Sequence, residues 1–392
     1  MFGVKNMNRR VLFIHDGPRK KDLKGNIWGY SSDLELKERY SYLGGKVDFL
    51  MRIFSMEKSL ENEMLVLQYY KIDVIGVPPF NRPRFLLNYY KASNIIKDTI
   101  KKYDILIIRL PSTIGSLSLK YAKKYKIPYL VEVVACPWDA LWNYSVLGKL
   151  YAPFSFLKLR RNVKYAPFVI YVTNGFLQSR YPNYRQNIGI SDVVIKGCSN
   201  AKLEYYAKMD TKNTYHIATL AAIDVPYKGQ EFVIKAMSYL KGKGYNLVYH
   251  IAGGGRQDRL RKITNKLRLE ANVVFEGLLK RDKVLCLLDS IDIYIQPSKL
   301  EGLPRALVEA MSRGCVCVGT DVGGIPELLT SEFVFKAGDV NEIISKIEQI
   351  IHSKDKATVA RDNINKASIF QKDILDAKRN SFYDSFILSY FK

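Results

Sequence analysis

The sequence predicts two α/β domains, each built around a mostly parallel, doubly wound sheet. Three observations lead to this prediction. The chain has 392 residues, which is long for a single hydrophobic core. Short apolar runs alternate with helix-periodic stretches along its whole length, and this alternation is typical of parallel sheets. Hydrophobic residues make up 47% and charged residues 25% of the chain, a composition typical of globular proteins.

The first predicted domain covers residues 1–200 and opens with a strand at 10–15. A helix follows over 31–43, with a serine as its N-cap and Gly44-Gly45 at its end. Further strands are expected at 46–52, 72–77, 105–109, 129–134 and 168–172, and further helices at 87–103 and 117–126.

The second predicted domain covers residues 201–374, after a polar join at 196–214 without periodicity. A last helix, at about 375–392, is expected to pack back on the first domain. Strands are expected at 215–220, 247–252, 273–276, 291–296, 316–319 and 333–335, and helices at 230–240, 256–269, 283–289, 305–313 and 341–352. Two such domains would leave a cleft at the carboxyl ends of their strands, where a ligand is expected.

The chain is basic, and its charge is concentrated in the first half. The formal net charge is +23, of which residues 1–200 carry +17. Nucleic acid and an anionic membrane surface both fit such a charge. No apolar run reaches the roughly 18–20 residues of a transmembrane helix, and the run at 11–14 is too short for a signal peptide, so we expect a cytoplasmic protein.

A basic and aromatic stretch at 150–165 has two interpretations. Aromatic residues among Lys and Arg favour a lipid headgroup interface, which would place the protein at the inner face of the cell membrane. The alternative is the solvated basic face of an ordinary helix. The relevant residues are Tyr151, Phe154, Phe156, Lys158, Arg160, Arg161 and Lys164.

The most informative segment runs from Gln296 to Met311 and reads QPSKLEGLPRALVEAM. A strand is expected to end at Gln296, and Pro304 is expected to be the first residue of a helix. The backbone N–H groups at such a helix start are free donors that suit a diphosphate. Glu301 precedes the helix and Glu309 lies within it, and a carboxylate can accept from two neighbouring hydroxyls of a ribose or a sugar.

This segment resembles the signature of glycosyltransferase family four, which has two glutamates separated by seven residues. The resemblance extends over about 215–351 and implies the GT-B fold, in which two Rossmann-like domains face a central cleft. It further implies a retaining glycosyltransferase that uses a nucleotide-sugar donor. The other matching elements are Tyr227-Lys228-Gly229-Gln230, residues 251–255, residues 274–277 and residues 314–327.

The resemblance also implies roles for individual residues. Lys228 would contact the donor phosphates, Glu301 the donor sugar and Glu309 the ribose. The backbone amides of Gly302, Leu303 and Pro304 would surround the diphosphate, although Pro304 itself has no N–H to donate.

Three further residues are candidates for ligand contact. Gly277 ends a strand that would lie beside the nucleobase. Gly29 could face the phosphates from the first domain, or could be a plain turn glycine. Glu132 could contact a hydroxyl of the acceptor or donor, or could be a buried structural acid.

The sequence departs from the family at two places. Residues 220–226 contain no arginine to accompany Lys228, so this phosphate contact is either missing or supplied from elsewhere, with Arg256 and Arg281 as the candidates. The segment 131–139 contains no histidine, which many relatives carry there. Because the departing phosphate can itself take the acceptor proton, no enzymatic base is required.

We predict no metal and no cofactor, because no Asp-x-Asp pair stands at a strand end. The expected partners are a UDP- or GDP-linked sugar and a glycan or lipid-linked acceptor, in synthesis of a bacterial surface polysaccharide such as capsule, lipopolysaccharide or exopolysaccharide. The alternatives are a sugar-nucleotide epimerase of the GT-B fold and a basic nucleic-acid-binding protein. No nucleic-acid recognition motif accompanies the charge, so we expect no specific nucleic acid partner.

Overall fold

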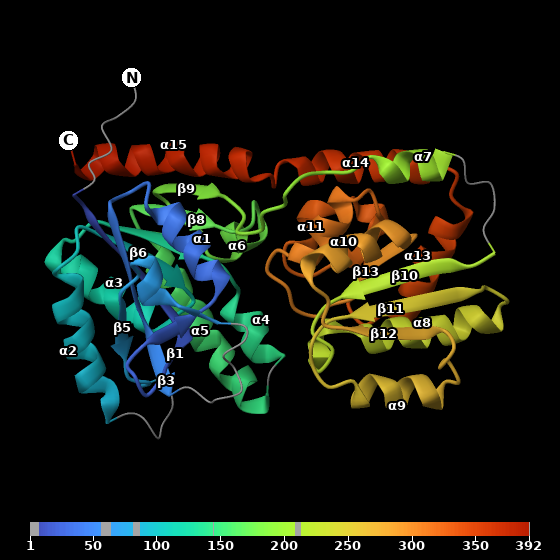
Figure 1. The fold of residues 1–392 in the computed structure, drawn as a ribbon, viewed down its shortest axis with the longest axis horizontal. Coiled ribbons are helices and arrows are strands. Elements are labelled where there is room, and N and C mark those ends of the chain that lie inside the picture. Colours follow the sequence, from blue (N-terminus) through green and yellow to red (C-terminus); the bar gives the residue numbers. More distant parts are fainter. Residues whose placement is uncertain (1–7, 56–63, 81–86, 144, 208–212, 392) are drawn as a thin grey trace.

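A computed structural model describes residues 8–55, 64–80, 87–143, 145–207 and 213–391. Figure 1 shows two halves side by side, each with a sheet that carries helices on its faces. The predicted fold class, two parallel-sheet α/β units, is confirmed. The boundary at residue 200 stays a prediction.

The first sheet has seven strands in the order β5-β3-β1-β6-β7-β8-β9, all parallel, and two short antiparallel strands, β2 and β4, at the end of β1. The strands are β1 (Arg10–Lys21), β2 (Ile27–Gly29), β3 (Lys46–Ser55), β4 (Leu65–Val66), β5 (Val74–Val77), β6 (Ile105–Leu110), β7 (Tyr129–Val133), β8 (Phe168–Tyr171) and β9 (Gln186–Gly189).

The helices of the first half follow its strands in alternation. They are α1 (Ser31–Tyr40), α2 (Asn88–Ile100), α3 (Thr113–Tyr125), α4 (Pro137–Trp142), α5 (Val146–Lys164) and α6 (Phe176–Arg180), with a 3-10 turn at Leu67–Tyr70.

The second sheet has six parallel strands in the order β12-β11-β10-β13-β14-β15. They are β10 (Tyr215–Leu220), β11 (Leu247–Ala252), β12 (Val273–Gly277), β13 (Ile293–Gln296), β14 (Val316–Thr320) and β15 (Val334–Phe335). The first two have the predicted bounds: Thr214 precedes β10, and Asn246 and Gly253 flank β11.

The helices of the second half include two long ones that close the chain. They are α7 (Ala201–Ala207), α8 (Gln230–Gly242), α9 (Asp258–Lys266), α10 (Arg281–Ser290), α11 (Arg305–Ser312), α12 (Ile325–Leu328), α13 (Val340–His352), α14 (Lys356–Ser368) and α15 (Lys372–Tyr390), with 3-10 turns at Pro226–Lys228 and Ser331–Phe333. Helix α7 falls inside the predicted polar join, and residues 208–212 of that join lie outside the described residues.

Strand β1 corrects one expectation, because it continues past the predicted end at residue 15, through Asp16-Gly17-Pro18, to Lys21. Its pairing with β3 shifts register between Ile14 and Pro18. A bulge of this kind removes a residue from the hydrogen-bond ladder, so it tolerates a proline that has no N–H.

Helix α15 leaves the second half and packs on the first. Its side chains Leu375, Phe382, Tyr383 and Phe386 are buried in the same hydrophobic cluster as Phe168 of β8. Figure 1 shows α15 running along the first half and α14 along the second. The chain therefore crosses between the halves twice, and the two crossings pair at Ile195 and Gln371.

Candidate functional site

Lys228 and Glu301 form an ion pair where two neighbouring strands of the second sheet end. The Lys228 Nζ lies 2.7 Å from the Glu301 Oε1, and the side chains are 20% and 10% exposed. Lys228 follows β10 and Glu301 follows β13, and these strands are adjacent and parallel. The carboxyl ends of parallel strands share one edge, which brings together two residues 73 positions apart.

The pairing requires a close approach of two loops. Gly229 has φ +76°, and a Cβ built there would lie 2.0 Å from the carbonyl oxygen of Pro297. The N–H of Lys299 donates to the carbonyl of Tyr227 at 2.7 Å and joins the same loops. Glycine after Lys228 is therefore a structural requirement of the ion pair.

Gln296 and Ser298 hold Glu301 from the strand side. The Ser298 Oγ donates to the Glu301 Oε1 at 2.7 Å, and the Gln296 Nε2 donates to the same oxygen at 3.0 Å. All of these contacts go to Oε1, so within the described residues Oε2 has no donor and can accept from a ligand. Sequence reasoning gave neither residue a role, although both lie in the quoted motif.

The loop Gly302–Pro304 leads into α11. Within the described residues, the N–H groups of Gly302 and Leu303 donate no hydrogen bond. Helix α11 begins at Arg305, where the predicted range 305–313 begins, and Pro304 is its N-cap and not its first helical residue. The donors at this helix start are therefore Gly302, Leu303 and the first helical residues.

Glu309 lies one turn inside α11, partly buried and close to two arginines. Burial raises the pKa of its carboxyl above the ordinary value, and the charges of Arg305 and Arg281 oppose that rise. A partly buried carboxylate between exposed arginines can accept from a ligand hydroxyl while the arginines meet negative charge.

Two other predicted features lie at the rim of this edge. Gly277 ends β12 with φ +68°, and a Cβ there would meet no atom within 4 Å, so the position is open. Two arginines could accompany Lys228. The charge of Arg281 lowers the pKa of Glu309, whereas Arg256 is exposed and lies just before α9.

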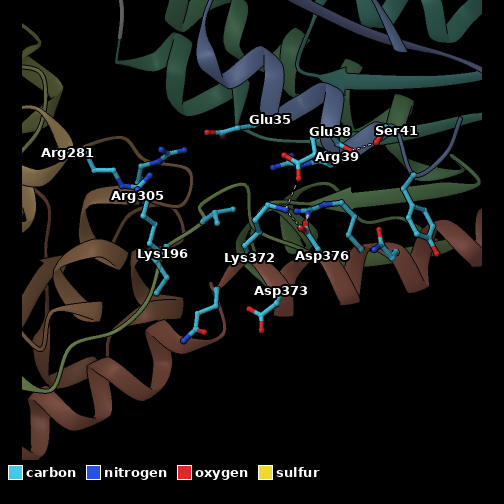
Figure 2. A pocket seen from close by; sticks show the side chains of 16 residues that line it. Glu35, Glu38, Arg39, Ser41, Lys196, Arg281, Arg305, Lys372, Asp373 and Asp376 are labelled. Carbon is cyan, nitrogen blue, oxygen red and sulfur yellow. Dashed lines mark hydrogen bonds and ion pairs between the residues drawn. The ribbon is translucent and has the colours of Figure 1, made fainter. Parts of the chain in front are cut away.

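A cavity of about 780 Å³ lies between the halves, next to the arginines of Glu309. Figure 2 shows Arg281, Arg305 and Lys196 together on the side of the second half, with Glu35 of α1 reaching toward them. Neither Glu301 nor Glu309 lines this cavity. Because known ligand pockets have volumes of about 300–1,000 Å³, a nucleotide fits by size.

A second cavity of about 310 Å³ shares Glu35, Arg39 and Arg305 with the first. It lies at the end of the straight part of β1, where His15 and Gly17 line it. Burial, and the charge of Arg109 after it, lower the pKa of His15 to about 4, so the imidazole is neutral at physiological pH.

Glu132 lies inside the first half. It is 3% exposed, and its Oε2 accepts from the Tyr40 hydroxyl at 2.8 Å and from the Arg109 Nη2 at 2.8 Å. Arg109 in turn lines the smaller cavity with Asp192. The position of Glu132 fits the structural alternative, because the side chain is buried and Arg109 lies between it and the smaller cavity.

Gly29 lies in β2 and is buried. A Cβ at this position would lie 2.3 Å from the Asp33 Oδ2 and 2.7 Å from a methyl carbon of Leu67. Glycine is needed here for packing, and no space for a ligand lies on the side where a Cβ would point.

Two features are absent from the described residues. No group of three or more His, Cys, Asp or Glu side chains is arranged to hold a metal ion there. Among the described helices, none combines the length and apolarity that crossing a bilayer requires.

Comparison with known proteins decides the family. Residues 205–367 match the family described as glycosyl transferases group 1. The sequence is 30% identical to protein CapJ of Staphylococcus aureus, over 95% of this chain and 97% of CapJ. The chain belongs to the group 1 glycosyltransferases. It is a nucleotide-sugar-dependent transferase, and the epimerase and nucleic-acid alternatives give way to that assignment.

Other relatives of this glycosyltransferase match over smaller parts. The putative colanic acid biosynthesis glycosyltransferase WcaL of Salmonella typhimurium is 36% identical over 26% of this chain and 27% of its own length.

Solved structures show the same GT-B fold. Anabaena HepE in complex with UDP-glucose superposes with a TM-score of 0.66, at 17% identity, over 97% of this chain and all of that one. The lipopolysaccharide outer core galactosyltransferase WaaB superposes with a TM-score of 0.60, at 14% identity, over 97% and 99%.

Proposed function

We propose that this glycosyltransferase moves a sugar from a UDP- or GDP-linked donor to a glycan or lipid-linked acceptor, with retention, in synthesis of a bacterial surface polysaccharide. The observation that carries the proposal is the Lys228–Glu301 pair beside the start of α11. The names of two relatives support the setting, since WcaL is named for colanic acid biosynthesis and WaaB for the lipopolysaccharide outer core.

Breaking the bond between sugar and diphosphate leaves negative charge on the departing phosphate. Lys228 supplies a positive charge, and the free N–H groups of Gly302 and Leu303 supply hydrogen bonds. Donors that are already in place stabilise this charge without reorganisation, which lowers the barrier. The sugar then lies against Glu301, whose Oε2 accepts from its hydroxyls.

Glu309 holds the ribose in this proposal, and Arg305 and Arg281 take the place of the absent arginine. The positive charges of both arginines lower the pKa of Glu309, and both side chains line the larger cavity. The nucleotide would therefore extend from the start of α11 toward that cavity, with Gly277 beside the base. The departing phosphate takes the acceptor proton, so the neutral His15 is not required as a base.

A donor panel tests the proposal. UDP- and GDP-sugars are incubated with lipid-linked and free glycan acceptors, and released nucleotide is measured. We expect one donor to be turned over by the wild-type chain and not by a Glu301→Ala, Glu309→Ala double variant. Proton NMR of the product should show the anomer of the donor. An inverted anomer, or full turnover by the double variant, would contradict the proposal.

The same assay tests the need for a metal. We expect turnover to be unchanged in excess EDTA, because Lys228 and backbone donors supply the charge stabilisation. Loss of turnover in EDTA with recovery on addition of Mn²⁺ would contradict the proposal that no metal ion is required.

We further propose that α5 contacts the anionic inner face of the cell membrane. The helix exposes large apolar side chains beside basic ones, and Leu150 and Phe154 are each 69% exposed. Exposed apolar area together with Lys and Arg is what an anionic headgroup region binds. The exposed apolar residues are Val146, Leu147, Leu150, Tyr151, Phe154 and Leu157, and the exposed basic ones are Lys149, Lys158, Arg160 and Arg161.

Liposome flotation tests this contact. The wild-type chain should float with vesicles that contain phosphatidylglycerol and stay behind with pure phosphatidylcholine. The Arg160→Glu, Arg161→Glu variant should lose flotation, while Lys241→Glu, an exposed change in the second half, should keep it. Equal flotation of all three proteins would remove the proposal.

A further inference from the structure

Glu327 links the two halves of the molecule. Its carboxylate, carried by α12 of the second half, accepts three consecutive backbone N–H groups from the first half. The Glu327 Oε2 accepts from Asn174 at 2.6 Å, and the Oε1 accepts from Gly175 at 3.0 Å and from Phe176 at 2.5 Å. These N–H groups stand at the start of α6, directly after β8, where a helix leaves its donors without internal partners.

The same segment touches the donor-binding loop on its other side. The N–H of Gly324 donates to the carbonyl of Gly302 at 2.6 Å. A Cβ at Gly324 would lie 2.8 Å from Leu303 of that loop and 3.3 Å from Thr173 of the first half. Gly324 thus fills a narrow space between the loop and the end of β8.

A third contact places the loop itself against the first half. A Cβ at Gly302 would lie 3.3 Å from the carbonyl oxygen of Val134, at the end of β7. The loop that contains Glu301 is therefore in contact with the opposite half both directly and through Gly324 and Glu327.

We infer that Glu327 is a positioning residue, which holds the first half against the donor-binding loop when the halves are close together. The inference rests on the proposed function, in which a donor on the second half must meet an acceptor on the first. A carboxylate that accepts three N–H groups forms strong, directional bonds only at short separation. These bonds would therefore be lost when the halves move apart, and would favour the arrangement in which transfer occurs.

The folding of α12 does not depend on this carboxylate. Ile325 and Leu328 are 0% and 4% exposed in the core of the second half, and they anchor the helix on the other side. A Glu327→Gln variant should therefore fold, while its amide nitrogen would face N–H groups and repel them.

The test compares wild type with Glu327→Gln, and uses Glu332→Gln as control. Glu332 is an exposed glutamate five residues away, whose side chain contacts only Thr330 among the described residues. We expect kcat to fall about 30-fold in Glu327→Gln, because the population of the closed arrangement falls by that factor. The Kd for uridine diphosphate, measured by calorimetry, should stay within about twofold, since the residues proposed above to hold the nucleotide all belong to the second half.

Hydrogen exchange measures the contact itself. Amide exchange in a peptide that covers 174–176 should be at least about tenfold faster in Glu327→Gln than in wild type and in Glu332→Gln. Unchanged exchange there, or an unchanged kcat despite faster exchange, would overturn the inference. A parallel loss of kcat, nucleotide affinity and melting temperature would also overturn it, since that result marks a merely structural role. If the wild-type chain turned over no donor, the proposed function would fail, while the exchange measurement would still test the link.

Discussion

Glu301 in the second half and Glu132 in the first are both acids near the carboxyl end of a parallel strand, and both accept several hydrogen bonds at one oxygen. Their surroundings differ. Glu301 lies in a loop before a helix start, beside N–H groups that donate no hydrogen bond to any described residue. Glu132 lies within β7, 3% exposed, behind Arg109. The comparison teaches that, of these two acids, only the one placed where the chain has left its strand has backbone donors beside it that could meet a ligand.

The largest effect should follow from changing Glu301. Replacing it with glutamine removes the charge next to Lys228 and weakens the hold on the sugar. We expect kcat to fall on the order of 10²–10³-fold, the range typical of a lost transition-state contact. Released-nucleotide assays measure this effect, and the melting temperature should change little, because glutamine keeps an oxygen that can accept from Gln296 and Ser298. If the Glu301→Gln variant lost much of its stability but kept normal turnover, Glu301 would have a structural role and not a role in binding the sugar.

The matching change in the first half should act on stability. Glu132→Gln leaves Arg109 with Asp192 as its remaining acid partner. We expect the free energy of unfolding to fall by about 2 kcal/mol, less than for a buried pair with no second partner. Chemical denaturation measures this loss, and kcat of the folded fraction should stay within about twofold of wild type. A Glu132→Gln variant that folds as well as wild type but cannot use the acceptor would make Glu132 a ligand contact.

How far the site could be predicted depends on where its parts lie in the chain. Glu301, Gly302 and Glu309 stand in one continuous segment, and strand, loop and helix geometry fix their relative positions. The hydrogen-bond partners of Glu132 and of Glu327 come from distant segments, so the sequence around either glutamate does not predict them. Asp192, which pairs with Arg109, had no sequence signal at all.

The fold shows the same limit. Strands of the second half could be predicted to within a few residues, because short apolar runs there alternate with helix-periodic stretches. The continuation of β1 to Lys21 could not, because a bulge carries the strand through Pro18, a residue that normally indicates a turn.

Glu309 gives a pH test of the second-half site. In the proposed complex its carboxylate must be charged to accept two ribose hydroxyls, and burial raises its pKa above the ordinary value. Donor affinity should therefore be complete above that raised pKa and fall as the pH falls through it, starting at a higher pH than for an exposed glutamate. Glu309→Gln should raise the donor KM about tenfold at pH 8 and remove this acid-side dependence. A dependence that persists in the variant would assign it to another group.

The smallest effect should come from Gly277→Ala. This variant distinguishes a conformational role of Gly277 from a contact with the ligand. Its φ of +68° costs an alanine about 1 kcal/mol in the free energy of unfolding, although no atom lies within 4 Å of the added Cβ. The Cβ would point into the space proposed for the base, so the donor KM should rise about threefold. Gly244→Ala, with φ +91° and equally open space, is the matched control, since it has the same backbone cost away from the cleft. Equal KM values in the two variants would place the base elsewhere and leave Gly277 with a conformational role alone.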